Sequence, residues 1–182
     1  HTEAEFRRMV GYGIPNLVEK FTPEECRDAA TLAAALAEFQ ACYGAHQRDR
    51  TVPYGGIPAM LSALKGQGLR LAVYSNKADE FSRSLAEHFF PGTFAAILGK
   101  RPGVPGKPDP AGLRLLLAEL GAAPEESVLV GDGETDVRSA RNAGLPCIAV
   151  TWGFRDRETL EREDPDALAE SPEELLTLLP TL

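Results

Sequence analysis

The sequence predicts an α/β protein built on a parallel β-sheet with helices on both of its faces. From about residue 51 onward, short apolar segments that suit strands alternate with stretches of helical periodicity. Such alternation is typical of βαβ units, in which each crossover helix returns the chain to the same sheet. The strands are almost uniformly apolar, as expected of a sheet covered on both faces. Composition agrees, because 182 residues of which 43% are hydrophobic and 25% charged can bury a core of ordinary size.

Residues 1–50 show only helical signals, and we interpret them as a small helical domain that precedes the α/β part at 51–182. Thr2 and Glu5 have the spacing of a capping box, in which each side chain accepts from the backbone N–H of the other residue. Thr22, followed by a proline, predicts the start of another helix. Beyond it, apolar side chains recur at the spacing of one helical face, at Leu32, Leu36, Phe39 and Tyr43.

The elements of the α/β part follow from apolar periodicity and from the glycines and prolines between the segments. Strands are expected at residues 69–74, 94–98, 127–130 and 147–150. Helices are expected around 57–64, 81–85, 113–120 and 137–140, with a final one beginning at 171–174. Gly66, Gly121 and Gly144 stand where three of these helices should end.

Charge and composition exclude several classes of protein. The 19 basic and 27 acidic residues give a net charge of −8, and the basic residues are scattered, so no nucleic-acid groove is expected. No apolar run approaches the roughly 18 residues of a membrane span, so no membrane partner is expected. The cysteines, Cys26, Cys42 and Cys147, form no CxxC pair and are expected as free thiols in a reducing cytoplasm.

Three groups of polar residues come after predicted strands. In an open parallel sheet, ligands bind beyond the carboxyl ends of the strands, so these groups are candidate site residues. In the first group, Ser75 and Asn76 follow the strand at 69–74 and precede a helix start. A hydroxyl and the backbone amides of a helix start can hold an anion. Taken alone, the two residues fit better with an ordinary helix N-cap.

The second candidate is Lys107, in a loop at 103–110 that is rich in glycine and proline. Lysines usually lie in solvent, but Pro108 restricts the backbone of Lys107 to an extended conformation, and Asp109 then starts a helix. The ammonium group is therefore expected at a defined place, as a fixed positive charge. A nucleotide-binding P-loop, GxxxxGK[ST], is excluded by its spacing and by its last residue.

The third candidate is the turn at 131–136, which holds the carboxylates Asp132 and Asp136 between a strand and a helix. Mg²⁺ takes one or two carboxylates and fills its other positions with water and phosphate oxygens, so the turn predicts a Mg²⁺ site. A dinucleotide-binding fingerprint, GxGxxG, is the nearest rival. It is disfavoured because Asp136 replaces the last glycine and Asp132 would repel a pyrophosphate. A turn that merely caps the helix explains either acid singly, but both together less well.

The order of these segments resembles that of the haloacid dehalogenase-like hydrolase superfamily, and most closely its phosphoglycolate phosphatase-like branch. The resemblance runs over nearly the whole chain, through residues 1–50, 73–77, 107–110, 131–136 and 150–153. It implies a Rossmann-like parallel sheet core with a small α-helical cap domain. It also implies a Mg²⁺-dependent phosphomonoester hydrolase that acts on a small phosphorylated metabolite, with 2-phosphoglycolate as the expected substrate.

The resemblance implies a role for each candidate residue. Ser75 and the Asn76 backbone amide would hold the transferring phosphoryl group, and Lys107 would neutralise its charge. Asp132 would bind Mg²⁺, and Asp136 would orient the metal site or Lys107. These roles agree with phosphoryl-transfer chemistry in general, which depends on positioning and on charge neutralisation.

One motif of the family is not found. Its Asp-x-Asp-Gly-Thr segment supplies the nucleophile and the general acid, and no such segment occurs in the 182 residues. We expect the motif and its central core strand upstream of His1, and we expect no aspartyl-phosphate chemistry from the 182 residues alone. Alternatives are a binding or regulatory relative without a nucleophile, a pyrophosphatase, a nucleotidase, and a sugar-phosphate phosphatase or mutase. Asp132 disfavours a metal-independent dehalogenase.

Three residues of the helical domain are candidates to contact the non-phosphate end of the substrate: Arg7, Arg8 and Tyr12. An arginine could pair with a carboxylate such as that of glycolate. Each arginine singly is better explained as a solvated helix charge, and the glycines beside Tyr12 are equally explained as a helix break.

Overall fold

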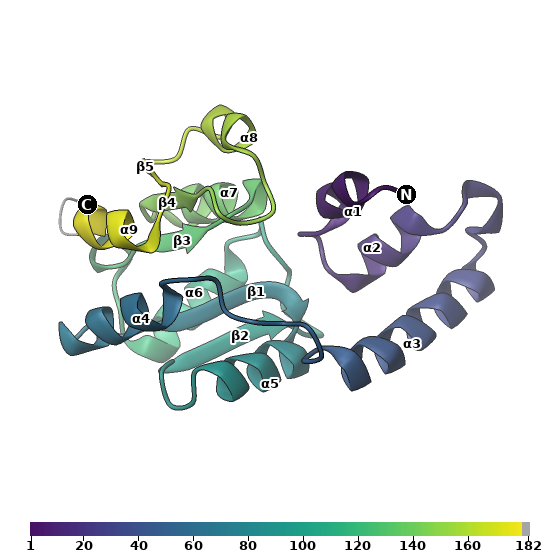
Figure 1. Cartoon of the computed structure of the whole chain (residues 1–182), viewed down its shortest axis with the longest axis horizontal. Coiled ribbons are helices and arrows are strands. Elements are labelled where there is room, and N and C mark those ends of the chain that lie inside the picture. The colour runs from purple at the N-terminus through teal and green to yellow at the C-terminus, as the bar shows by residue number, and fades with distance from the viewer. Residues whose placement is uncertain (180–182) are drawn as a thin grey trace.

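The computed structural model describes residues 1–179 and shows a helical part followed by an α/β part (Figure 1). The helical part contains α1 (Glu3–Met9), α2 (Ile14–Phe21), a short 3-10 turn (Glu24–Cys26) and α3 (Ala29–His46). The later helices are α4 (Ile57–Gly66), α5 (Asp79–Phe89), α6 (Ala111–Leu120), a 3-10 turn (Pro124–Glu126), α7 (Glu134–Ala143), α8 (Arg157–Arg162) and α9 (Pro172–Leu178). The domain boundary expected near residue 50 falls in the segment between α3 and α4.

The strands of the described chain all run parallel, and they form two sheets. They are β1 (Ala72–Ala78), β2 (Ala96–Lys100), β3 (Leu129–Gly131), β4 (Cys147–Val150) and β5 (Ala167–Ala169). β1 pairs with β2, while β4 pairs with β3 on one side and β5 on the other. A helix follows each strand, which confirms the predicted alternation of strands and crossover helices.

β4 is buried along its whole length and lies between two layers of helices. Cys147 and Ala149 belong to a core cluster with side chains of α6, α7 and α8. Ile148 and Val150 belong to another cluster, with side chains of α4 and α9. Because successive strand residues point to opposite faces, this alternation places helices on both faces of the sheet. The prediction of a doubly covered parallel sheet is confirmed.

The predicted single sheet is divided between β1 and β3, which are not hydrogen-bonded to each other. An apolar cavity of about 470 Å³ is lined by Ala72 and Tyr74 of β1, by Leu129 and Val130 of β3, and by side chains of α4, α6 and α9. Each of these two strands has one edge without a strand partner within residues 1–179. Such edges carry backbone N–H and C=O groups that can accept a further strand.

Several local predictions are confirmed by the boundaries of the elements. Thr2 and Glu5 form the capping box that starts α1. The side chain of Ser171 caps α9 by accepting from the Glu174 amide. α7 ends where predicted, since Gly144 follows it with a φ of 78°, a conformation that favours glycine.

Other boundaries differ from the prediction. α3 begins at Ala29 rather than after Thr22, because the Asp28 carboxylate accepts from the first amides of α3 and so caps it. β1 extends to Ala78, so Ser75 and Asn76 lie in the strand rather than at a helix N-cap. The pairing of β1 with β2 shifts register in this stretch. The short elements α2, α8 and β5 were not among the predicted ones.

A series of ring contacts connects the helical part to the α/β part. Phe6 of α1 stacks on Phe21 of α2, which contacts Phe39 of α3, and Tyr43 meets Phe81 of α5 edge-on at a centroid distance of 5.3 Å. These contacts use the predicted apolar face of α3, although α3 contains no fully buried residue. None of the helices within residues 1–179 has the length and apolar character needed to cross a membrane.

Candidate active site

Lys107 is held between the middle of β1 and the first turn of α7, although it lies in a loop. Its Nζ atom donates to Asp136 Oδ1 at 2.6 Å and to the Tyr74 carbonyl at 3.1 Å. The side chains of this ion pair are only 10% and 8% exposed. The attraction between two charges is stronger in such a buried environment than in water, and loss of either partner would leave the other charge buried and unpaired. The geometry therefore fixes the lysine charge at one point.

The side chain of Asn76 ties this loop to β1 and to the helical part. Its Oδ1 accepts from the Lys107 amide at 2.7 Å, and its Nδ2 donates to the carbonyls of Lys107 and Gly11 at 3.0 and 2.8 Å. Asn76 is buried, and the chain approaches it so closely at Gly106 that a β-carbon there would collide with Oδ1. The sequence singled out the backbone amide of Asn76, whereas its carboxamide organises the loop.

Ser75 lies beside this arrangement, directly after Tyr74. Its Oγ atom accepts from the Lys77 amide at 3.1 Å, which leaves the hydroxyl hydrogen able to donate to a ligand. The carbonyl of the preceding residue, Tyr74, accepts the hydrogen bond from the Lys107 ammonium. Ser75 and the Lys107 ammonium thus lie at the same stretch of β1.

Asp136 is buried in the first turn of α7, and both of its carboxylate oxygens have partners. Oδ1 accepts from Lys107, and Oδ2 accepts from the Gly133 amide at 3.1 Å. A β-carbon at Gly131 would overlap the Asp136 side chain, so the glycine after β3 makes room for this carboxylate. Asp136 therefore contacts the lysine directly.

Asp132 lies in the same turn but faces the loop that follows β4. Its Oδ2 accepts from the Phe154 amide at 2.7 Å, and a β-carbon at Gly153 would overlap its carboxylate. Within the described chain, Oδ1 of Asp132 has no hydrogen-bond partner. The contacts of the two carboxylates thus differ: both oxygens of Asp136 have partners among the described residues, and one oxygen of Asp132 does not.

The donor set fits a magnesium ion that is bound largely through water and substrate. The described residues contain no group of three or more histidine, cysteine or acidic side chains that could hold a metal. Mg²⁺ does not require such a cage, because it is commonly bound by one or two carboxylates together with waters and phosphate oxygens. The open oxygen of Asp132 satisfies that requirement, and the fully engaged Asp136 does not add a ligand.

Two other groups near the site are kept protonated. Burial, assisted by the nearby Asp136 charge, raises the pKa of the Cys147 thiol to about 12. Burial and the charge of Asp109 also raise the pKa of the Tyr74 phenol. Because a thiol reacts as its thiolate, Cys147 is not a nucleophile at neutral pH.

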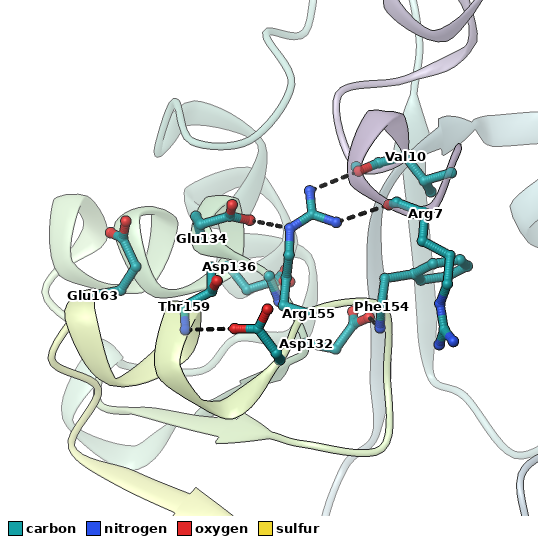
Figure 2. Close-up of polar contacts among 12 residues, drawn as sticks. Arg7, Val10, Asp132, Glu134, Asp136, Phe154, Arg155, Thr159 and Glu163 are labelled. Carbon is teal, nitrogen blue, oxygen red and sulfur yellow. Dashed lines mark hydrogen bonds and ion pairs between the residues drawn. The ribbon is translucent and has the colours of Figure 1, made fainter. Parts of the chain in front are cut away.

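Arg155, which the sequence did not single out, joins the helical part to this site (Figure 2). It is buried, pairs with Glu134 of α7, and reaches the carbonyls of Arg7 and Val10. The Arg7 guanidinium itself donates to the Gly153 carbonyl at 3.1 Å and lies over the Phe154 ring. No local pattern distinguishes Arg155, because two of its three hydrogen-bond partners are backbone carbonyls more than 100 residues away.

The other two candidates in the helical part lie in different surroundings. Arg8 is exposed, with no ion pair within the described residues. Tyr12 lines a cavity that also contacts Lys107, and its ring lies 5.1 Å from the Lys20 ammonium. Of the three residues expected near the non-phosphate end of a substrate, Tyr12 lines the cavity that reaches Lys107.

Comparison with known proteins identifies relatives in sequence and in fold. Residues 1–150 match the model of the haloacid dehalogenase-like hydrolase family. Phosphoglycolate phosphatases of Pseudomonas putida and Rhodospirillum rubrum are 33% and 35% identical, each over 84% of this chain. A crystal structure from Lactobacillus delbrueckii subsp. bulgaricus superposes with a TM-score of 0.88 at 28% identity, over 96% of this chain and 82% of the other.

The parallel strands and the helices on both of their faces define a Rossmann-like α/β fold with a helical segment before the core. The chain belongs to the haloacid dehalogenase-like hydrolase family. Within that family it lies in the phosphoglycolate phosphatase-like branch. The chain spans 55% and 66% of the lengths of the two phosphoglycolate phosphatases that it matches.

Proposed function

We propose that the protein is a Mg²⁺-dependent phosphatase of small phosphorylated metabolites, with 2-phosphoglycolate as its substrate. The main support is the buried Lys107 ammonium, fixed by Asp136 at 2.6 Å and by the Tyr74 carbonyl. A fixed charge at the reaction centre stabilises a phosphoryl group in transfer without reorganisation. The names of the two bacterial relatives support the choice of substrate.

The proposed roles follow from the contacts of each residue. Lys107 neutralises charge on the phosphoryl oxygens, and Asp136 positions Lys107, because its second oxygen is taken by the Gly133 amide. The Ser75 hydroxyl donates to a phosphoryl oxygen. The Asn76 backbone amide is a second donor, while the carboxamide of Asn76 holds the loop in place.

Asp132 is the proposed Mg²⁺ ligand. When bound, the ion supplies positive charge that offsets the developing charge on the phosphate oxygens. The Phe154 amide orients the Asp132 carboxylate by donating to Oδ2, so that Oδ1 remains available. This contact also links the metal ligand to the loop that carries Arg155.

Hydrolysis through an aspartyl-phosphate needs a nucleophile as well. We propose that an aspartate outside residues 1–182 supplies it, at the end of a strand that occupies the cavity between β1 and β3. Support comes from the two strand edges that are unpaired within residues 1–179 and from the apolar lining of that cavity.

We further propose that residues 1–50 act as a cap over a core formed by 51–182. The three free cysteines support a reducing cytoplasmic location.

The proposal is tested with protein expressed from the complete coding sequence. Phosphate release is measured from 2-phosphoglycolate, pyrophosphate, a nucleoside monophosphate and a sugar phosphate, with Mg²⁺ and with EDTA. We expect Mg²⁺-dependent release with the highest kcat/KM for 2-phosphoglycolate. Binding of these esters without any turnover would instead favour a binding or regulatory protein. Preferred turnover of another ester would overturn the choice of substrate.

A further inference from the structure

A cavity of about 540 Å³ lies between the helical part and the loop that carries Lys107. One wall is formed by side chains of α2, of α3 and of Tyr12, which precedes α2. The opposite wall is formed by Lys100, Gly106 and Lys107. A substrate whose phosphoryl group is held near Lys107 would therefore place its other end between α2 and α3.

Lys100, the last residue of β2, supplies an uncommitted positive charge on this cavity. Its ammonium has no ion pair or hydrogen bond within residues 1–179, whereas the Lys107 ammonium is already paired with Asp136. The side chain of Lys100 crosses the start of α2, since a β-carbon at Gly13 would lie 3.5 Å from its Nζ atom. The free charge is thus placed beside the turn that precedes α2.

The start of α2 adds to this positive region. Gly13 is the N-cap and provides no side-chain cap, so the first amides of α2 lack an internal acceptor. Asn16, in the same turn, lines the cavity, and its buried Oδ1 has no hydrogen-bond partner. A half-turn of its terminal torsion exchanges Oδ1 and Nδ2, so the carboxamide can donate to an anion.

Glu19 is the acidic residue on the same walls, and it lies farther along α2. Glu19 is six positions after Gly13 in the sequence, a rise of about 9 Å along the helix axis. The Gly13 end is the one next to the phosphoryl site, because a β-carbon at Gly13 would lie 3.1 Å from the Asn76 carbonyl. The cavity is therefore positive near Lys107 and negative at its far end.

We propose that Lys100 and Asn16 bind a carboxylate carried by the substrate. They would thereby select phosphorylated hydroxy acids over phosphate esters that lack a carboxylate. This inference rests on the proposed phosphatase function and names the part of the chain that recognises the rest of the substrate. A carboxylate carries one negative charge and matches the single uncommitted ammonium. The second phosphate of a bisphosphate would bring more charge than this wall can balance. A charge-assisted hydrogen bond supplies both affinity and orientation.

Binding of non-hydrolysable ligands tests this site separately from catalysis. Protein from the complete coding sequence is titrated calorimetrically, with MgCl₂, against 3-phosphonopropionate and against propylphosphonate, which lacks the carboxylate. We expect about 10- to 100-fold tighter binding of the carboxylate ligand, as one charged hydrogen bond gives. Lys100→Met should abolish this ratio, and Lys100→Arg should keep most of it. Asn16→Asp should lower the ratio, and Glu19→Gln should raise it.

Equal affinities of the wild-type protein for the two phosphonates would overturn the inference, as would an unchanged ratio in Lys100→Met. Tighter binding of propane-1,3-bisphosphonate than of 3-phosphonopropionate would also overturn it, in favour of a second phosphate. Thermal unfolding of each variant checks that it is folded, and Lys100→Arg keeps the test valid if Lys100→Met is not. A carboxylate-dependent ratio without hydrolysis of any ester would support this site while rejecting the phosphatase function.

Discussion

Arg155 and Glu134 form an ion pair at 2.6 Å in which the two side chains are 8% and 21% exposed. The other guanidinium nitrogens of Arg155 donate to the carbonyls of Arg7 and Val10 at 3.0 and 2.8 Å. One side chain thereby connects α7, next to the candidate site, with the end of α1 (Figure 2). Arg155 therefore helps to place the helical part against the site, together with the Asn76–Gly11 hydrogen bond and the Tyr43–Phe81 contact.

Arg155→Met should lower the free energy of unfolding by about 2–3 kcal/mol, because Glu134 and two carbonyls lose their charged partner. Arg157→Met is the matched control, since Arg157 makes ion pairs on the surface and is half exposed. Its loss should cost less than about 1 kcal/mol. Urea unfolding measures both free energies. Equal losses would show that the buried Arg155 ion pair stabilises the fold no more than the surface ion pairs of Arg157 do. Limited proteolysis should also cut residues 1–46 faster in Arg155→Met alone.

Lys107→Met should lower kcat for phosphomonoesters by about 10²- to 10³-fold, the usual effect of losing one preorganised charge at the reaction centre. Lys65→Met is the control, because the exposed Lys65 ammonium donates to the Gly92 carbonyl and contacts none of the site residues. Steady-state kinetics with 2-phosphoglycolate distinguishes the two variants. If kcat stayed at the wild-type value in Lys107→Met, the lysine would have only a structural role.

Most of the fold could be predicted because its signals are local. Gly144 ends α7 through its own backbone conformation, and the side chain of Ser171 caps α9 three residues on. The end of β1 could not be predicted in this way. Ser75 and Asn76 favour caps in isolation, but Tyr74 and Ala78 on either side of them pair with β2, and Asn76 bonds to the Lys107 loop, so the strand continues through them.

The candidate site was predictable where the chain itself restricts a residue. Pro108 limits the backbone of Lys107, and the strand before Asp132 directs the turn toward the edge of the sheet. Arg155 was not predictable, because its partners include the backbone carbonyls of Arg7 and Val10. Every residue has such a carbonyl, so nothing in the sequence marks these two as partners. The available charge on Lys100 likewise becomes visible only when its neighbours in space are known.

Asp132→Asn should weaken Mg²⁺ binding, whereas Asp136→Asn should leave it nearly unchanged, because only Asp132 has an oxygen without a partner. We expect the dissociation constant to rise about tenfold or more in Asp132→Asn, which corresponds to roughly 1.4 kcal/mol. Asp136→Asn should instead lower both kcat and stability, since the buried Lys107 ammonium loses its partner. Calorimetric titration with MgCl₂ gives the affinities. The reverse order of effects would exchange the two assigned roles.

Asp79, at the start of α5, should make stability depend on pH in the acid range. Burial alone would raise the pKa of this carboxyl, but hydrogen bonds from Arg83 and from the Gly99 amide outweigh burial and lower its pKa. A carboxyl whose pKa is lower in the folded state stabilises the fold at pH values above the ordinary pKa of aspartate. This contribution is lost as the pH falls through the folded-state pKa. Below about pH 4, the free energy of unfolding should therefore fall more steeply in the wild type than in Asp79→Asn. Parallel curves from urea unfolding at successive pH values would contradict this.

Cys147 should be inert in the folded protein, whereas the other two cysteines should react. Burial in β4 raises the pKa of its thiol to about 12, and Cys26 and Cys42 are exposed. Because disulfide reagents react with the thiolate, a dithiobis(nitrobenzoate) assay at neutral pH should modify two thiols quickly and the third only as the protein unfolds. Cys147→Ser should remove the slow phase and leave the fast one unchanged. Three thiols reacting together in the native wild type would mean that β4 is not enclosed between its two helix layers.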